Sequence, residues 1–330
     1  MIAAIGVDVG ATNIKLALVG VKGELRTLLR LFTPEQGRVE PVVKLLASAI
    51  LALQQEAERQ GDDAAGVGVG VAGWTDAERG IVRGAPNMEG WMDVPLRALL
   101  EERVKLPVVV DNDANAAAYA EAWVGAGRGC RSLVVLTLGT GIGGGLVLEG
   151  KIWRGSSGMA AEIGHMIVEP EGERCGCSGW GCLEAYTSAT AIVREARRII
   201  ASGNASGALA SFAGRLETLT AKDVAEAAKA GDAAAARVLE RAGRYLGIAL
   251  TSLINILSPE LIVIGGGMAQ AGELILGPAR AEVKRRLFTP LAEATRIILS
   301  PLQEEAGALG AAGLALEQFG HYNLMKQASA

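Results

Sequence analysis

Residues 2–19, IAAIGVDVGATNIKLALV, form two apolar runs that are separated by a short turn of glycine and small polar residues. This pattern predicts a β-hairpin, because glycine tolerates the backbone angles that a tight turn requires. Residues 133–149, LVVLTLGTGIGGGLVLE, repeat the scheme with a glycine-rich turn between two further apolar runs. The repeat predicts two related domains, each of which opens with a meander of strands.

Helical and strand patterns alternate along the rest of the chain, and the second half is mostly helical. Periodicity predicts helices at about 40–60, 95–104, 113–124, 185–203, 221–230, 233–257 and 306–318, and apolar strands at 66–72, 106–111 and 261–267. Strands that alternate with helices in this way predict an α/β fold.

The size and charge of the chain narrow its class. A length of 330 residues suits roughly two domains of ~100–200 residues each. The 36 acidic and 32 basic residues give a net charge of −4 without a basic patch, which argues against nucleic acid as a partner. The N-terminus lacks the basic region of a signal peptide, and no run of about 18 apolar residues predicts a membrane span. We therefore expect a soluble cytoplasmic protein without a membrane partner.

Three glycine-containing turns are candidates for binding phosphate. They are the turn at 8–12, the turn at 139–145, and 265–267, which ends an apolar strand. Small residues leave backbone N–H groups free to face phosphate oxygens, and Asp8 could hold Mg²⁺, which prefers oxygen ligands. Each turn alone is equally compatible with an ordinary turn, and none matches a Walker A or Rossmann sequence. The three together favour a nucleotide.

The segment Asp111-Asn112-Asp113-Ala114-Asn115 follows an apolar strand and opens a helix. Ligands of α/β sheets bind beyond the carboxyl ends of the strands, so a carboxylate here is well placed for catalysis. The alternative is a helix N-cap, which contributes ~1 kcal/mol by accepting hydrogen bonds from backbone N–H groups. Two Asp and two Asn in five residues exceed the needs of one cap. We expect one residue to cap the helix and another to act on a substrate.

A further polar candidate is Asn87, which follows Pro86 and precedes Gly90-Trp91. Taken alone, this stretch is an ordinary turn. The amide of Asn87 nevertheless offers both the donor and the acceptor that a sugar hydroxyl requires.

The segment 162–184, EIGHMIVEPEGERCGCSGWGCLE, contains three of the four cysteines and one of the two histidines. His165, Cys175, Cys177 and Cys182 form a complete tetrahedral ligand set for structural Zn²⁺, with no open position for catalysis. The alternative is a set of buried apolar cysteines in a glycine-rich turn. Three cysteines within eight residues favour the metal, and thiolates in this role indicate a reducing compartment.

Taken in order, these motifs resemble those of the ROK family (repressors, open reading frames and kinases), within the actin-like or hexokinase superfamily. The resemblance covers essentially the whole chain. It rests on DVGAT at 8–12, PN and GW within 86–91, NDAN at 112–115, GTGIGGG at 139–145, EIGH at 162–165, CGCSGWGCLE at 175–184 and GGG at 265–267. One departure is Ser178, which stands where the family usually has glycine. The departure concerns the backbone of the turn and leaves the metal ligands unchanged.

The resemblance implies an α/β fold of two actin-like (ribonuclease H-like) domains with a cleft between them. A small N-terminal domain would span 1–111 with about 312–330, and a large domain carrying the zinc loop would span 112–311. The family contains sugar kinases and repressors, and the repressors have a winged helix-turn-helix before the first hairpin. Asp8 stands too close to the start for one, so we expect a kinase. The EIGH motif at 162–165, followed by the cysteine run to Glu184, is most like the glucokinase branch. Family members are often dimers or tetramers, so a homo-oligomer is expected.

The resemblance also implies residue roles. Asp113 is the general base that accepts the proton of a hexose 6-hydroxyl as it attacks the γ-phosphate of ATP. One ring nitrogen of His165 binds Zn²⁺ and the other binds a sugar oxygen, so the zinc is structural but adjacent to the substrate. The residues expected to bind the hexose are Asn87, Asn112, Asp113, Glu162, His165 and Glu184. Those expected to bind ATP with Mg²⁺ are Asp8, Gly10, Ala11, Thr12, Lys15, Gly139, Thr140, Gly141, Gly265, Gly266 and Gly267.

Glucose is the expected substrate, in an ATP-dependent reaction that yields glucose 6-phosphate. Alternatives of the same class are kinases for N-acetylmannosamine, N-acetylglucosamine, fructose or allose, and glucokinases that use polyphosphate. A sugar sensor without catalytic activity is a third alternative. The presence of Asp8, Asp113 and both glycine-rich turns argues against the sensor.

Overall fold

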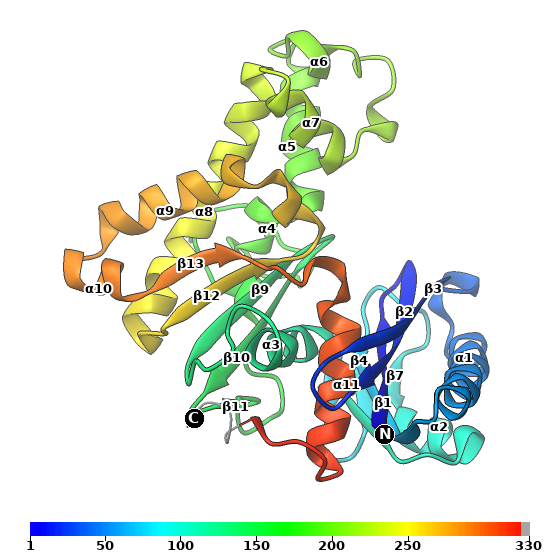
Figure 1. The fold of residues 1–330 in the computed structure, drawn as a ribbon. Coiled ribbons are helices and arrows are strands. Elements are labelled where there is room, and N and C mark those ends of the chain that lie inside the picture. Colours follow the sequence, from blue (N-terminus) through cyan, green and yellow to red (C-terminus); the bar gives the residue numbers. More distant parts are fainter. Residues whose placement is uncertain (325–330) are drawn as a thin grey trace. The chain divides into compact units, whose positions relative to one another are not determined.

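The computed structural model describes residues 1–324 and has a mixed α/β fold, which confirms the predicted fold class. Contacts divide the chain into two compact units (Figure 1). Unit 1 comprises Met1–Val135, Gly145–Ala161 and the chain from Pro301 onward, and unit 2 comprises Leu136–Gly144 and Glu162–Ser300. The predicted domain limits stay a prediction, because compactness alone does not define bodies that move together. Residues 325–330 of the predicted small domain lie outside the described residues.

A five-stranded sheet with the order β3-β2-β1-β4-β8 belongs to unit 1. Antiparallel pairs join β1 to β2 and β2 to β3, whereas β4 lies parallel to β1 and β8 parallel to β4. The predicted first hairpin is confirmed, but Asp8 and Val9 still pair with β2, so the turn itself is shorter than predicted. The strands are β1 (Ile2–Val9), β2 (Asn13–Gly20), β3 (Leu25–Phe32), β4 (Asp63–Val71) and β8 (Val108–Asn112).

The α-helices of unit 1 were all predicted at nearly their observed bounds. They are α1 (Val39–Arg59), α2 (Leu96–Val104), α3 (Asp113–Trp123) and α11 (Ala306–Gln318). Helix α1 buries an apolar face that includes Val43, Leu46 and Ile50. Helix α11 packs against β1, β4 and α3. This close approach requires glycine on β4, since a Cβ on Gly68 would overlap the carbonyl oxygen of Ala311.

A small antiparallel sheet, β5 (Trp74–Asp76), β6 (Ile81–Gly84) and β7 (Met92–Val94), lies between β4 and α2 in the chain. It was not predicted, because strands of three or four residues are too short to show a period of two. The sheet matters for the site because the turn between β6 and β7 carries Asn87.

A second five-stranded sheet has the order β11-β10-β9-β12-β13. Numbered in chain order within each sheet, both sheets read 3-2-1-4-5, as the predicted internal duplication requires. The turn of its first hairpin is only 139–141, so Gly143, Gly144 and Gly145 belong to a strand and not to the predicted turn. The strands are β9 (Leu133–Leu138), β10 (Ile142–Leu148), β11 (Lys151–Ile152), β12 (Leu261–Gly265) and β13 (Arg296–Leu299).

The predicted helix at 185–203 is in fact two helices. Ser188 has an extended backbone (φ −68°, ψ 161°), and its side chain accepts a hydrogen bond from the N–H of Ala191, so it caps a new helix. Helix α9 was not predicted, because Pro278 interrupts its pattern. The α-helices of unit 2 are α4 (Glu184–Thr187), α5 (Ala189–Ala201), α6 (Gly207–Ala210), α7 (Ala221–Lys229), α8 (Ala233–Leu257), α9 (Glu273–Arg286) and α10 (Thr289–Ala294).

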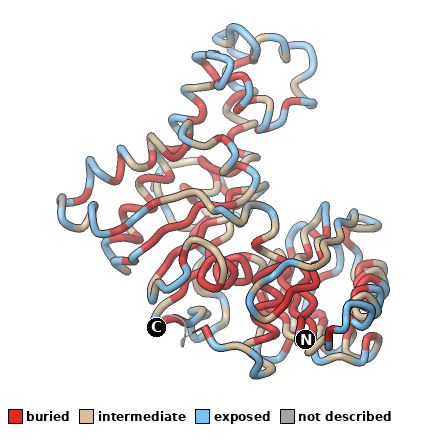
Figure 2. Tube along the Cα trace, in the orientation of Figure 1, coloured by how far each residue is buried: buried red, intermediate tan, exposed pale blue. Residues whose placement is uncertain are grey.

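Short 3₁₀ helices complete the chain: η1 (Glu35–Gly37), η2 (Ile163–His165), η3 (Leu216–Thr218), η4 (Gly267–Ala271) and η5 (Gln303–Glu305). Burial is concentrated in the strands and in the helix faces that pack on them, while the outer faces of helices are exposed (Figure 2). Within residues 1–324, none of the helices has the length and apolar character that crossing a membrane would demand.

Candidate active site

The junction between β8 and α3 resolves which residue of 111–115 caps the helix. The side-chain oxygen of Asn112 accepts hydrogen bonds from the N–H groups of Ala114 (2.8 Å) and Asn115 (3.1 Å). Its amide nitrogen donates to the carbonyl oxygen of Gly73 at 3.0 Å. Asn112 is therefore the residue of this segment that caps the helix. Its oxygen is occupied twice, and its amide group also donates to the carboxylate of Asp113, so its side chain is fully engaged at this junction.

Asp111 and Asp113, two residues apart, have different environments. The side chain of Asp111 is buried, forms an ion pair with the guanidinium of Arg154 and accepts a hydrogen bond from the side chain of Asn115 at 3.0 Å. Its charge is thus already compensated within unit 1. Arg154 lies beyond β11 in the chain, and no sequence pattern pointed to this partnership.

Asp113 is the first residue of α3 and is half-buried. One of its carboxylate oxygens accepts a hydrogen bond from the N–H of Ala114 at 2.9 Å. Burial raises the pKa of Asp113 above its usual value, and hydrogen bonds from Ala114 and Asn112 oppose that rise. A carboxyl group whose pKa moves toward neutrality is suited to accept a proton during catalysis.

Asp8, at the end of β1, lies close enough to Asp113 for their charges to interact. Burial first, and the charge of Asp113 second, raise the pKa of Asp8 to about 7, while Lys15 on β2 opposes the rise. The ammonium group of Lys15 donates a hydrogen bond to the carbonyl oxygen of Glu304 at 2.9 Å. Two neighbouring carboxylates and a lysine form a set that suits a hard divalent cation and the phosphates it accompanies.

The turn that carries Asn87 is held by Trp91. The indole N–H of Trp91, which is buried, donates a hydrogen bond to the carbonyl oxygen of Gly37. Asn87 itself is exposed at the tip of this turn. The tryptophan therefore anchors the turn, and the asparagine is the member of the predicted motif that remains accessible to a ligand.

The four predicted metal ligands come together in unit 2. The sulfur atoms of Cys175, Cys177 and Cys182 and a ring nitrogen of His165 all lie within 4.8 Å of one another. The sulfurs of Cys177 and Cys182 are 3.7 Å apart, and the sulfur of Cys175 is 3.8 Å from Nδ1 of His165. Thiolates bound to a tetrahedral zinc ion at ~2.3 Å would be separated by about 3.8 Å. The four side chains therefore fit a metal ion.

The pKa values of the three cysteines shift in different directions. Burial acts to raise the pKa of Cys177, but hydrogen bonds from the backbone of Gly179 and from the other two thiols outweigh it and lower that pKa. Burial raises the pKa of Cys175 to about 12 and also raises the pKa of Cys182. Both are therefore thiols at neutral pH until a metal ion displaces their protons.

Glu162, His165 and Glu184 surround this cluster. Nδ1 of His165 is the nitrogen near the sulfur of Cys175, and Nε2 is 3.9 Å from the carboxylate of Glu162. One oxygen of Glu184 accepts a hydrogen bond from the N–H of Ile142 at 3.0 Å, and the other lies 3.4 Å from the sulfur of Cys175. Glu184 thus connects the cysteine loop to the end of the glycine-rich turn. This structural connection is additional to the role toward a sugar that the sequence predicted for Glu184.

The glycine-rich turn 139–141 is joined to the start of α5. The N–H of Ala189 donates to the carbonyl oxygen of Gly139, and the hydroxyl of Thr190 donates to that of Thr140, both at 2.9 Å. The turn thus meets the N-terminus of a helix of 13 residues, where backbone N–H groups and the helix dipole favour an anion.

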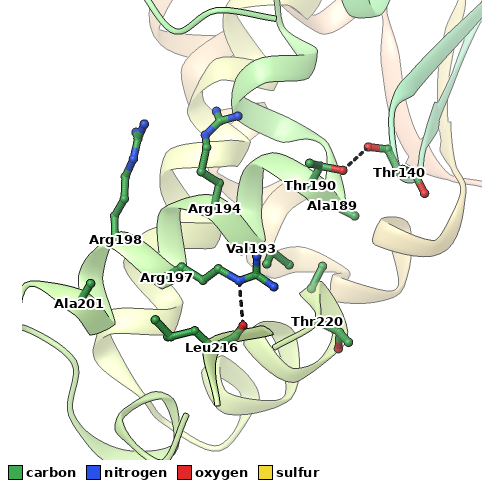
Figure 3. Close-up of a pocket in the computed structure, with 11 residues that line it drawn as sticks. Thr140, Ala189, Thr190, Val193, Arg194, Arg197, Arg198, Ala201, Leu216 and Thr220 are labelled. Atoms are coloured by element: carbon green, nitrogen blue, oxygen red, sulfur yellow. Dashed lines mark hydrogen bonds between the residues drawn. The ribbon is translucent and has the colours of Figure 1, made fainter. Parts of the chain in front are cut away.

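A cavity of about 710 Å³ in unit 2 begins at this turn and was not predicted from the sequence (Figure 3). One side of α5 contributes most of its wall, and the turn with Thr140, η3 and the start of α7 contribute the rest. The lining residues are Thr140, Ala189, Thr190, Val193, Arg194, Arg197, Arg198, Ala201, Leu216, Thr220 and Ala221.

Gly265 ends β12, and the two glycines that follow it have different surroundings. Gly266 has a positive φ of 83°, and a Cβ at this position would overlap the backbone of Leu138, so packing alone requires glycine here. A Cβ on Gly267 would meet nothing within 4 Å, which leaves its backbone open to a ligand. Packing alone therefore explains why residue 266 is glycine, whereas the backbone of Gly267 is accessible.

Comparison with known proteins places these features in a family. A family model described as the ROK family matches residues 4–318. Glucokinase from Thermotoga maritima is 41% identical over 320 residues, which is 96% of this chain and 98% of that protein. A crystal structure of a ROK family glucokinase from Streptomyces griseus, in complex with glucose and AMPPNP, is 37% identical and superimposes with a TM-score of 0.82, covering 96% of this chain and 99% of that one.

A solved structure from the regulatory side of the family is also similar. A ROK family transcriptional regulator, described as a homolog of the E. coli MLC protein, has a TM-score of 0.85 at 27% identity. The match covers 100% of this chain but only 81% of that one. The fold is therefore shared by kinases and regulators, and the site residues have to decide between them.

Proposed function

This chain belongs to the ROK family, and on that basis we propose that it is a glucokinase, which transfers the γ-phosphoryl group of ATP to the 6-hydroxyl of glucose. The observation that carries the proposal is the nearly full-length similarity to proteins named glucokinase, at a higher identity than to the regulator. The glucose and AMPPNP in the Streptomyces griseus structure support a hexose and ATP as the two substrates.

Asp113 is the proposed general base. It stands at the carboxyl end of β8, where ligands of α/β sheets bind, and its pKa is raised toward the pH of the reaction. Asp111, the other carboxylate of the segment, is unsuited because Arg154 already compensates its charge. Asp113 accepts the proton of the 6-hydroxyl while the oxygen attacks phosphorus, and the barrier falls mainly through positioning and charge neutralisation.

The phosphates of ATP are proposed to lie at the two short hairpin turns. Asp8 would hold the Mg²⁺ that accompanies ATP, since it is the carboxylate next to both the first turn and Lys15. When bound, that ion would neutralise phosphate charge. The N-terminus of α5 and the turn 139–141 offer N–H groups to a second phosphate. The full proposed set is Asp8, Gly10, Ala11, Thr12, Lys15, Gly139, Thr140, Gly141, Gly265, Gly266 and Gly267.

The hexose is proposed to be bound by amides, carboxylates and an imidazole. Asn87 is exposed, the amide of Asn112 lies next to the carboxylate of Asp113, and Nε2 of His165 is 3.9 Å from the carboxylate of Glu162. Each hydroxyl left without a partner costs about 1–3 kcal/mol, which is how such a set selects one sugar. The proposed hexose ligands are Asn87, Asn112, Asp113, Glu162, His165 and Glu184.

His165, Cys175, Cys177 and Cys182 are proposed to hold a structural zinc ion. The fit of their spacing to a tetrahedral ion supports this assignment. Binding through Nδ1 would fix the tautomer of His165 so that Nε2–H can donate to a sugar oxygen. We further propose that the protein works in the cytoplasm and that it forms a homo-oligomer. Light scattering of the purified protein measures the oligomeric state directly.

A kinase assay over a panel of sugars tests the proposal. Glucose, N-acetylmannosamine, N-acetylglucosamine, fructose and allose are each offered with Mg²⁺ and either ATP or inorganic polyphosphate. The expected result is the highest kcat/KM with glucose and ATP. A preference for another sugar or for polyphosphate would reassign the substrate within the same class. Glucose binding by calorimetry with no phosphorylation of any sugar would identify a sensor and refute the kinase.

A further inference from the structure

One arginine in the cavity beside α5 is fixed in a way that its neighbours are not. Nε of Arg197 donates a hydrogen bond to the carbonyl oxygen of Leu216 at 2.8 Å, and Nη2 donates to that of Glu217 at 3.2 Å. Two parallel bonds to consecutive carbonyl groups of η3 hold the guanidinium plane in one orientation. The plane lies in the cavity, between α5 and η3 (Figure 3).

The other arginines of α5 have partners elsewhere. Arg194 donates to the carbonyl oxygen of Ala185, and Arg198 forms an ion pair with the carboxylate of Glu173. Figure 3 shows both side chains directed away from the space that Arg197 enters. Because the partners of Arg197 are neutral carbonyl oxygens, its positive charge is not cancelled by a carboxylate.

The cavity has a polar end and an apolar part. Thr140 and Thr190 stand at the polar end, next to the turn and the N-terminus of α5. Val193, Leu216 and Ala201 line the part that contains Arg197. Arg197 lies seven positions after Thr190 on α5, which corresponds to about 10 Å along the helix axis. A nucleoside with its phosphates at the polar end would therefore place its base beside Arg197.

We propose that Arg197 is the platform on which the base of the phosphoryl donor stacks, and so determines the specificity for a nucleotide donor. The inference rests on the proposed function, in which that donor is ATP. A guanidinium plane stacks on an aromatic ring through cation–π and dispersion attraction, and a plane that is already fixed loses little entropy when the base arrives. Stacking rewards a large purine surface, and a donor without a base gains nothing from it.

Two substitutions separate a platform from a simple charge. Arg197→Met removes the plane and the charge, and Arg197→Lys keeps the charge but removes the plane. We expect both to raise the KM for ATP by about 5- to 30-fold, the equivalent of one cation–π contact, with kcat and the KM for glucose nearly unchanged. Arg237→Met, at an exposed position of α8, is the charge-matched control and should leave all three values unchanged.

Inorganic tripolyphosphate, used as an inhibitor competing with ATP, provides the second measurement because it has phosphates but no base. If Arg197 acts as a platform, the inhibition constant of tripolyphosphate is the same in wild type and Arg197→Met. The proposal is overturned if Arg197→Lys retains the wild-type KM for ATP, or if tripolyphosphate loses affinity as much as ATP does. Either result would make Arg197 a phosphate-binding charge.

A failure of the proposed function would give a different result. If the wild-type protein showed no ATP-dependent phosphorylation, the kinase assignment would fall, and the affinity for ADP would then be measured by calorimetry. Weaker ADP binding in Arg197→Met and Arg197→Lys would still support the platform. Equal ADP binding by wild type and both variants would overturn it. Circular dichroism of each variant confirms that the helices of unit 2 are intact.

Discussion

Two segments of the chain carry most of the proposed site, and they keep their shape in different ways. At the junction of β8 and α3, a strand runs directly into a helix, and Asn112 caps that helix with its own side chain. Between Glu162 and Leu183, all of which the structure describes, regular structure amounts to one 3₁₀ helix of three residues and two isolated bridges. The first segment is shaped by its regular structure and by the side-chain cap of Asn112, whereas the second requires an additional constraint, for which a metal ion is suited.

This difference predicts that the first segment tolerates loss of its chemistry without loss of shape. We expect Asp113→Asn to lower kcat by about 10²–10⁴-fold, the usual contribution of a positioned general base, with the dissociation constant for glucose nearly unchanged. The reason is that the hydrogen bonds that shape the junction come mainly from Asn112. Steady-state kinetics and calorimetry with glucose measure the two quantities. Asp63→Asn, at an exposed position, is the control.

Wild-type turnover by Asp113→Asn would remove Asp113 from the mechanism. A loss of glucose affinity as large as the loss of kcat would show instead that Asp113 acts mainly as a hexose ligand, or that the junction depends on this carboxylate for its shape.

The cysteine loop is expected to behave in the opposite way: substitution of a metal ligand should first disturb the shape of the loop, and glucose binding should weaken as a consequence. Cys175→Ser should lower the metal content from about one equivalent per chain and raise the KM for glucose by about 10–100-fold, because the metal would fix both the loop and the tautomer of His165. Elemental analysis and kinetics measure these effects. Cys130→Ser should retain both the metal and the KM, since Cys130 is not part of the cluster.

Hydrogen exchange distinguishes the two segments in the same variant. In Cys175→Ser, backbone amides of 166–183 should exchange faster while those of α3 remain protected. Equal acceleration in both segments, or a metal-free wild-type protein with an ordered loop, would contradict the division between backbone-shaped and metal-shaped regions.

The ionisation of Asp8 makes the free energy of unfolding depend on pH. The ordinary pKa of 3.8 becomes about 7 in the folded protein, so the folded state holds this proton more tightly than the unfolded chain. The free energy of unfolding of the Mg²⁺-free protein should therefore fall as pH rises from about 4 to about 7. Asp8→Asn removes this penalty and should gain stability over wild type at pH 8 but not at pH 4.

The expected gain is on the order of 1–2 kcal/mol, reduced from the full linkage value because Asp8 is partly exposed. Urea unfolding at the two pH values, without Mg²⁺, measures it. A stability difference between variant and wild type that does not change with pH would show that Asp8 ionises normally in the folded protein.

The parts of the fold that follow from local pattern could be predicted from the sequence, and the parts that follow from long-range packing could not. The hairpins, the helix at 113–124 and the cysteine cluster have short-range signals. The ion pair of Asp111 with Arg154 joins residues that are 43 positions apart. An aspartate and an arginine at such a separation form no recognisable sequence pattern. For the same reason, local pattern alone could not distinguish Asp111 from Asp113. The resemblance to the family assigned the base to Asp113, and the structure adds that Asp111 is the carboxylate that is already paired.

The cavity beside α5 was missed for a similar reason. Its walls come from a turn near 140, from α5 and from residues 216–221, which meet only in the folded chain. Some shape information was nonetheless present in the sequence. Ser178 was identified as a departure from the glycine usual in the family, and the structure gives it a positive φ of 72°, a conformation that glycine adopts without a Cβ penalty.

The smallest expected change in stability comes from a substitution of Ser178 in the cysteine loop. A non-glycine residue in the left-handed region costs about 1–2 kcal/mol, part of which is offset because glycine is more flexible in the unfolded chain. Ser178→Gly should consequently stabilise the protein by about 0.5–1 kcal/mol, measured by urea unfolding at constant metal content. Gly181→Ser is the matched opposite, since Gly181 also has a positive φ (70°) and its Cβ would overlap the carbonyl oxygen of Glu169.

We expect Gly181→Ser to destabilise the loop and to lose metal to a chelator faster than wild type, whereas Ser178→Gly should lose it more slowly. If the metal alone determined the shape of the loop, the two substitutions would change metal release equally little. A difference of opposite sign would show that the backbone angles of Ser178 and Gly181 share that task with the metal, so that even the less regular of the two segments is partly shaped by its own chain.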